Sequence, residues 1–178
     1  YNMLDYEWEN LEYLLSQATS YNYEQEFVAL VNLLTVPNLG VMGYLDIRVF
    51  WRDASRWLAE TAAIISKTAN ANSIELAIVR AKQGVFAVKQ VQMDEGKAFL
   101  EQAITVLKEA AENPEAALYL AYAHESMSQI AFREGVPHAL PWLEKSLAAW
   151  SHLPAGVNQT EQSYFQTRYA SMLGRGGQ

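Results

Sequence analysis

The sequence predicts an all-α protein, a right-handed α-solenoid of antiparallel helical hairpins. Aromatic–leucine pairs recur at Trp57-Leu58, Phe99-Leu100 and Trp142-Leu143, which are 42 and 43 residues apart. Such a period is typical of stacked helical hairpins, each burying its apolar face against the next. Alanine, leucine, glutamate and glutamine are abundant, and the five prolines lie mostly where helices should end. These observations together indicate an all-helical chain.

Small residues accompany the repeated pair at fixed positions. One lies four residues before each leucine and another three residues after it, so two helices of a hairpin can approach closely there. The aromatic rings are expected to pack between neighbouring repeats. The predicted repeat core consists of Ala54, Trp57, Leu58, Gly84, Gly96, Phe99, Leu100, Ala103, Ala139, Trp142 and Leu143.

The first helical hairpin is predicted over residues 4–36. Leucines and aromatic residues spaced for one buried stripe indicate its first helix, and a second begins near Tyr23. Pro37 lacks a backbone donor and disfavours helix at Val36. The glycine-containing stretch that follows predicts either a kinked helix or two short ones.

Three repeats are predicted next, over residues 38–68, 72–112 and 114–150. Ser73 is a candidate N-cap, and Asn113-Pro114 ends one helix and begins another. Gly135 marks the end of a further helix. A capping helix over residues 158–173 completes a single domain spanning residues 1–173, and residues 174–178 are expected to form a disordered tail.

Charge and composition narrow the classes of function. The formal net charge is −7 at pH 7 and the pI is near 5.0, so a nucleic-acid backbone would be repelled and no direct nucleic-acid binding is expected. The absence of cysteine excludes disulfides and thiolate catalysis. No apolar run reaches the roughly 18 residues of a membrane span, and no signal peptide begins the chain. We therefore expect a cytoplasmic protein without membrane contact.

Part of the chain resembles the tetratricopeptide repeat family. Gly84 lies twelve positions before Gly96, the family's offset between its small residues, and Ala103 and Asn113-Pro114 continue the pattern. Met127 replaces the expected glycine of the next copy, and the repeat is longer than the family's usual length of about 34 residues. The resemblance implies a scaffold that binds partners.

Two segments resemble, more narrowly, the helical region of STAND-type signalling ATPases. Residues 5–15 match an acidic E-x-x-N-L-x-x-x-L helix, and residues 44–60 match a G-Y-W-x-E-A-x-x-W-L segment, with Val49 in place of the family's glycine. This resemblance implies the sensing arm of a larger transcriptional or signalling regulator. Because the chain begins at Tyr1, we expect a fragment of a longer protein, whose upstream nucleotide-binding domain is one possible partner.

No catalytic, cofactor or metal site is predicted. His124, His138 and His152 are fourteen residues apart, without the short helical spacing typical of metal ligands. The glycines at positions 40 and 43 lack the Lys-Ser/Thr of a phosphate-binding loop. We therefore expect a protein that is not an enzyme.

The predicted binding site is the concave face that the tetratricopeptide resemblance implies. Its candidate residues are Lys82, Val85, Lys89, His124, Ser128 and Phe132. The two lysines, seven residues apart, could pair with a peptide carboxylate, or they could simply be solvated. A protein or peptide is the expected ligand. Two alternatives stay open: a small-molecule sensor pocket lined by aromatic residues inside the superhelix, and a self-associating scaffold that exposes Trp8 and Tyr13.

Overall fold

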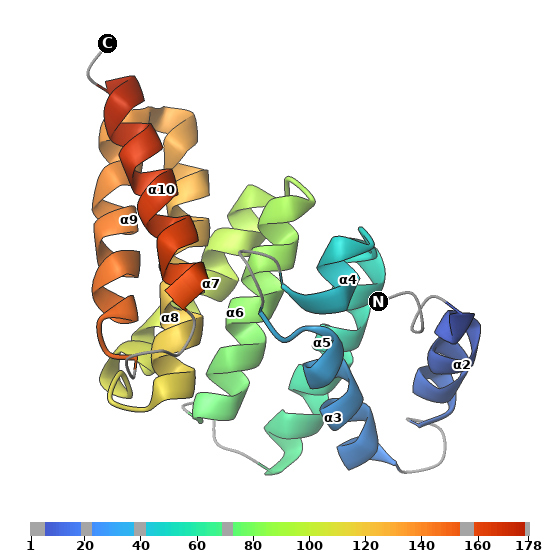
Figure 1. The fold of residues 1–178 in the computed structure, drawn as a ribbon. Coiled ribbons are helices and arrows are strands. Elements are labelled where there is room, and N and C mark those ends of the chain that lie inside the picture. Colours follow the sequence, from blue (N-terminus) through green and yellow to red (C-terminus); the bar gives the residue numbers. More distant parts are fainter. Residues whose placement is uncertain (1–5, 19–22, 38–41, 69–72, 154–158, 177–178) are drawn as a thin grey trace.

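The computed structural model describes residues 6–18, 23–37, 42–68, 73–153 and 159–176. These ranges contain nine α-helices, one short 3-10 helix and no β-strand, so the predicted all-α class is confirmed for the described chain (Figure 1). The arrangement is that of a helical bundle or solenoid. None of the described helices is both long and apolar enough to cross a membrane.

Three helices form the N-terminal part: α2 (Trp8–Ala18), α3 (Glu24–Leu34) and the short α4 (Gly43–Ile47). The stretch after Pro37 thus contains a separate short helix rather than a kinked long one. Gly43 begins this helix with φ +74°, and a Cβ placed there would lie 2.4 Å from the Leu34 carbonyl oxygen. The close approach of α4 to the end of α3 therefore requires glycine.

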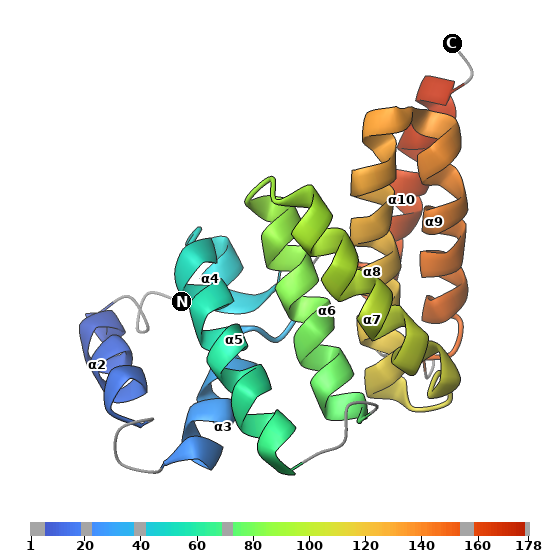
Figure 2. The same ribbon diagram turned by 180° about the vertical axis from the view of Figure 1, so that it is seen from behind.

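The remaining helices run alternately in opposite directions (Figures 1 and 2). They are α5 (Trp51–Thr68), α6 (Ile74–Lys89), α7 (Met93–Glu109), α8 (Pro114–Ala131), the 3-10 helix η1 (Phe132–Glu134), α9 (Val136–Trp150) and α10 (Gln159–Gly176). Each of α5 to α9 packs against the next, and α6 also packs against α8. The most extensive contacts join α6 to α7 and α8 to α9, which are the two helical hairpins of the body.

Helix ends follow the predicted signals closely. Ser73 Oγ accepts a hydrogen bond from the Leu76 amide at 3.2 Å, and Asn113 Oδ1 accepts one from the Glu115 amide at 2.9 Å. Gly135 takes φ +117° between η1 and α9. The prediction of a disordered tail from residue 174 is wrong for its first residues, because α10 continues to Gly176.

The repeated small residues lie where the helices of each hairpin meet. Gly84 of α6 faces Gly96 and Leu100 of α7 so closely that a Cβ at Gly84 would lie 2.5 Å from Leu100 Cγ. In the next hairpin, Ser146 Oγ of α9 donates a hydrogen bond of 2.8 Å to the Ala121 carbonyl of α8. Glycine in one pair and a buried hydroxyl in the other both permit close approach of the helix backbones.

Most of the predicted repeat core is buried, and two rings are exceptions. Phe99 and Trp142 are only half-buried. Phe99 contacts Arg80 and Trp142 contacts His124, both on the preceding helix of the same hairpin, and Lys145 of α9 also lies over the Trp142 ring. The buried members are Ala54, Trp57, Leu58, Gly84, Gly96, Leu100, Ala103, Ala139 and Leu143.

Candidate functional site

The predicted binding face is largely occupied by the chain's own side chains, beginning with Lys82. This residue is 1% exposed, and its Nζ donates a 2.8 Å hydrogen bond to Asn32 Oδ1 of α3. The ammonium lies 5.2 Å from the ring centre of Tyr119. Burial lowers the pKa of Lys82 to about 7, an effect that the Glu115 carboxylate partly opposes. Lys82 is therefore not available to a peptide carboxylate, contrary to the sequence-based expectation.

Lys89, the second predicted lysine, already has an internal partner. Its Nζ lies 2.7 Å from Asp46 Oδ2 of α4, and the Asp46 side chain is almost fully buried. Asp46 also accepts hydrogen bonds from the Met42 amide at 2.7 Å and from Trp51 Nε1 at 3.0 Å. The ammonium charge of Lys89 is thus neutralised by the Asp46 carboxylate of α4.

The groove residues of α8 are also mostly buried. His124 lies beneath the Trp142 ring, at 5.7 Å between ring centres, and burial together with Lys145 lowers its pKa to about 4. Ser128 is buried and donates to the Glu125 carbonyl of its own helix at 2.6 Å. Val85 of α6 is buried, and Phe132 is 38% exposed. Of the six predicted residues, Phe132 is therefore the most accessible.

Helix α10 packs against another side of α8. Arg168 of α10 forms an ion pair with the buried carboxylate of Glu125, which also accepts a 2.9 Å hydrogen bond from Gln129. The ring of Phe165 packs edge-on against Tyr122, with 5.3 Å between ring centres. Helix α10 thus contacts the side of α8 that carries Tyr122 and Glu125, whereas the predicted His124 lies against Trp142 of α9.

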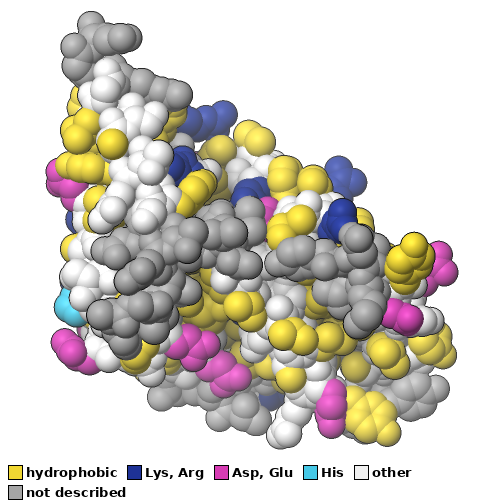
Figure 3. Space-filling model, in the orientation of Figure 1, with side chains coloured by type: hydrophobic (Ala, Val, Ile, Leu, Met, Phe, Trp, Pro, Cys, Tyr) yellow, Lys and Arg dark blue, Asp and Glu magenta, His cyan; other side chains and the backbone are white. Residues whose placement is uncertain are grey.

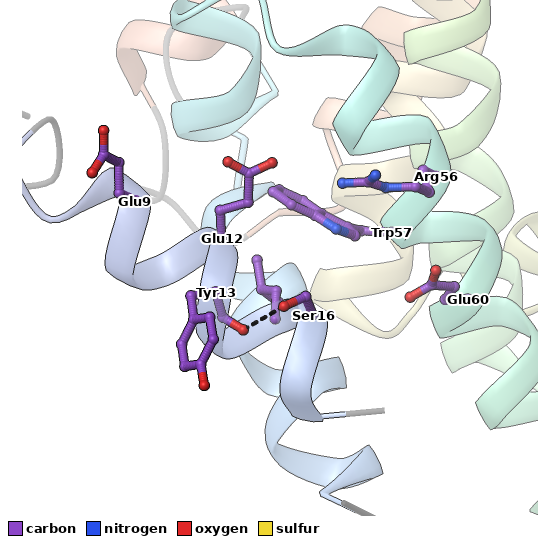
Figure 4. A pocket seen from close by; sticks show the side chains of 8 residues that line it. Glu9, Glu12, Tyr13, Ser16, Arg56, Trp57 and Glu60 are labelled. Atoms are coloured by element: carbon purple, nitrogen blue, oxygen red, sulfur yellow. Dashed lines mark hydrogen bonds between the residues drawn. The ribbon is translucent and has the colours of Figure 1, made fainter. Parts of the chain in front are cut away.

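An open recess lies elsewhere, between α2 and α5 (Figure 4). Its volume is about 540 Å³, and it is lined by Glu9, Glu12, Tyr13, Leu15, Ser16, Arg56, Trp57 and Glu60. The spacing of three to four residues places the lining residues of α2 on one face of that helix: residues 9, 12, 13 and 16. The same spacing places those of α5 on one face of α5: residues 56, 57 and 60. The two helix faces therefore form the two walls of the recess.

An aromatic cluster fixes α2 at one end of this recess. Trp8 stacks on Phe50 with 4.5 Å between ring centres, and it lies 5.6 Å from Tyr44 and 5.8 Å from Trp57. Leu15, which is buried, anchors the same helix further along. The separation of α2 from α5 is thus set by rings that belong to the core.

The chemistry of the recess is acidic and aromatic. Glu9, Glu12 and Glu60 contribute three carboxylates, against the single guanidinium of Arg56. That guanidinium lies 5.5 Å from the ring centre of Trp57 and 3.3 Å from the Asp53 carboxylate. Figure 4 shows Trp57 between the two helices, with Glu12 of α2 on one side and Arg56 and, below it, Glu60 of α5 on the other. Such an arrangement suits a cation with an apolar stem.

Sequence reasoning missed this recess, because Trp57 reads as a residue of the repeat core and α2 as one half of a hairpin. The acidic face of α2 was the available signal. In the structure that face stays exposed, and its Glu12 lies beside the recess in front of Trp57 (Figure 4).

Fold and recess together define an all-helical protein with an open acidic recess near one end. No family model matches the sequence, and no curated protein matches it either. Within the described ranges, no three histidine, aspartate or glutamate side chains come together as a potential metal site.

Proposed function

We propose that the chain is a protein-interaction module, built as a tetratricopeptide-like α-solenoid, that binds a basic segment of a partner protein in the recess between α2 and α5. The observation that carries the proposal is the recess itself, whose lining combines three carboxylates with two aromatic side chains. The packing of consecutive antiparallel helices and the contact between α6 and α8 support the solenoid.

A lysine or arginine side chain suits this recess better than an anion. Its cation could approach Glu12 and Glu60, while its methylene stem packs on the exposed ring of Tyr13. Tyr13 is 64% exposed and therefore available for such packing. The net charge of −7 would add long-range attraction for a basic partner and accelerate encounter.

The test is binding of capped tetralysine and tetra-arginine peptides, measured by calorimetry at low and moderate salt. The double variant Glu12→Gln/Glu60→Gln should weaken binding. The matched control Glu109→Gln/Glu112→Gln removes the same charge from exposed positions at the end of α7 and should leave binding nearly unchanged. Equal loss in both variants would show non-specific attraction by net charge, and the proposal would fail.

We further propose that the module is the sensing arm of a larger nucleotide-dependent regulator. The support is the resemblance of residues 5–15 and 44–60 to STAND-type proteins. In the full-length protein, deleting residues 6–176 should change basal nucleotide hydrolysis. A full-length protein without a nucleotide-binding domain would refute this part.

Self-association is a second candidate, favoured by one apolar feature. A cavity of about 290 Å³ between α2 and α3 is lined mainly by apolar side chains, among them Leu15, Phe27 and Leu30. At its rim, Leu14 and Tyr23 are 56% and 57% exposed. Light scattering over a range of concentrations tests this candidate, and Leu14→Glu should abolish any dimer.

A further inference from the structure

Two valines on one edge of the molecule adopt a backbone conformation that β-branched residues rarely take. Val49 has φ +63° and Val91 has φ +65°, and they are the only non-glycine residues with positive φ that the structure records in its described part. The left-handed region is unfavourable for a side chain with two substituents on Cβ, and glycine is the usual residue there. Both valines therefore strain the backbone.

The two valines occupy the same place in consecutive repeats, 42 residues apart. Val49 ends the turn between α4 and α5, where the Phe50 amide donates to the Leu45 carbonyl at 2.8 Å. Val91 ends the turn between α6 and α7, where the Gln92 amide donates to the Ala87 carbonyl at 2.9 Å. In the turn between α8 and α9, the chain uses a glycine with positive φ, Gly135.

The strain does not serve the core, because both side chains face solvent. Val49 is 61% exposed and Val91 is 63% exposed. Two exposed apolar side chains are thus held in an unfavourable backbone conformation at equivalent positions, where they are accessible to another molecule.

The two turns lie next to each other and enclose a hollow. Gln90 Nε2 donates to Ser55 Oγ at 2.8 Å and to the Trp51 carbonyl at 3.2 Å, which joins the second turn to the start of α5. A recess of about 480 Å³ opens at this junction, and Val49, Phe50, Arg52 and Gln92 are among its lining residues. Its walls combine apolar groups with amides, as a peptide-binding site requires.

The charge at this edge favours an acidic ligand. Within the described chain, Arg52 is exposed and forms no ion pair, whereas Asp53 beside it is paired with Arg56. Figure 3 shows basic side chains gathered in the upper part of this face, around α4 and above α6. This distribution contrasts with the net charge of −7 of the whole chain, which would disfavour an anionic membrane surface.

We propose that the edge formed by Val49, Val91 and Arg52 is a second interaction surface, which binds a peptide segment that alternates apolar and acidic residues. The apolar side chains of the peptide would contact the two valines, and a carboxylate would pair with the guanidinium of Arg52. This surface would thus prefer an acidic ligand, whereas the acidic recess between α2 and α5 would prefer a basic one.

The experiment uses the whole chain, labelled for amide NMR, and titrates three capped peptides: Leu-Glu-Ile-Glu, Leu-Gln-Ile-Gln and Leu-Lys-Ile-Lys. We expect the acidic peptide to bind most tightly, with shifts at the amides of residues 49–53 and 90–92. Arg52→Gln should weaken its binding by up to about fivefold, the range of an exposed ion pair. The matched control Arg133→Gln, exposed beside the next turn, should not change it.

The valines are tested by the double variant Val49→Gly/Val91→Gly. It should lose peptide binding and keep or raise its thermal midpoint, because glycine relieves the strain. A lowered midpoint would show that the valines serve folding, and this would overturn the proposal. Equal binding of all three peptides, no shift at either turn, or preferential binding to vesicles of anionic lipid would also overturn it.

Discussion

Replacing Gly84 with alanine tests whether the close crossing of α6 and α7 determines stability. The added methyl group would lie 2.5 Å from Leu100 Cγ, 2.7 Å from Leu100 Cδ2 and 3.1 Å from the Gly96 carbonyl oxygen. The first two distances are shorter than carbon atoms tolerate. Leu100 is fully buried and cannot simply turn away. The two helices must therefore separate, or Leu100 must adopt a strained rotamer.

Two opposing effects set the magnitude. Overpacking of a well-packed core costs about 1–3 kcal/mol, and three short contacts place Gly84→Ala near the upper end. Replacing glycine with alanine inside a helix gains about 1 kcal/mol. The net loss in the free energy of unfolding should be about 1–2 kcal/mol. For a chain of this size, that loss lowers the thermal midpoint by roughly 2–8 °C.

Urea unfolding followed by circular dichroism measures this loss, provided that the slope with denaturant is unchanged. Gly174→Ala is the matched control, because a methyl group there meets nothing within 4 Å and the residue lies in α10. It should be neutral or slightly stabilising. Leu100→Ala should remove much of the penalty of Gly84→Ala, giving a coupling between the two sites. If Gly84→Ala proves as stable as the parent, the crossing is not close-packed and the reasoning fails.

Three further predictions concern buried or anchoring groups. Because the pKa of Lys82 is lowered to about 7 in the folded chain, the unfolded chain binds more protons above that pH. Stability relative to a Lys82→Met variant should therefore rise between pH 7 and about 10, by at most about 1.4 kcal/mol per pH unit in urea titrations. His124, whose pKa is lowered to about 4, should make stability fall as the pH drops from about 6.5 to 4, and His124→Gln should reduce that fall. Trp8→Ala should remove the stacking on Phe50 and cost about 1–3 kcal/mol, seen as faster amide exchange in α2 and little change in α6 to α9.

The helices could be predicted from sequence because their signals are local. Ser73 and Asn113 cap helices through contacts with residues two or three positions away, and Pro114 stands in the first turn of α8. The repeated small residues indicated where helices cross, since that information is carried by spacing alone. The end of α10 was misjudged because glycines at positions 174 and 176 suggest fraying, yet the helix includes them.

The state of the binding face could not be predicted, because it depends on pairings distant in sequence. Lys82 meets Asn32, Lys89 meets Asp46, and Arg168 meets Glu125, and each pair is separated by some forty to fifty residues. A lysine on a helix surface reads as solvated until the segment that covers it is known. No local sequence pattern indicates which distant residue will pair with such a side chain. The family resemblance, in turn, implies an open groove.

The recess between α2 and α5 lies at the end of the fold where a helix packs least extensively on its neighbours. Helices α6 to α9 pack extensively on their neighbours, whereas α2 contacts few residues of α3 and is fixed to α5 by the rings around Trp8. In stacked helical structures stability is approximately a sum of neighbouring interfaces, so α2 should open at a lower free energy than the body. Under the proposed function, a wall that opens at low cost would adjust its distance from α5 to basic side chains of different size. The loosely attached α2 is therefore also a wall of the recess that we propose binds a basic segment.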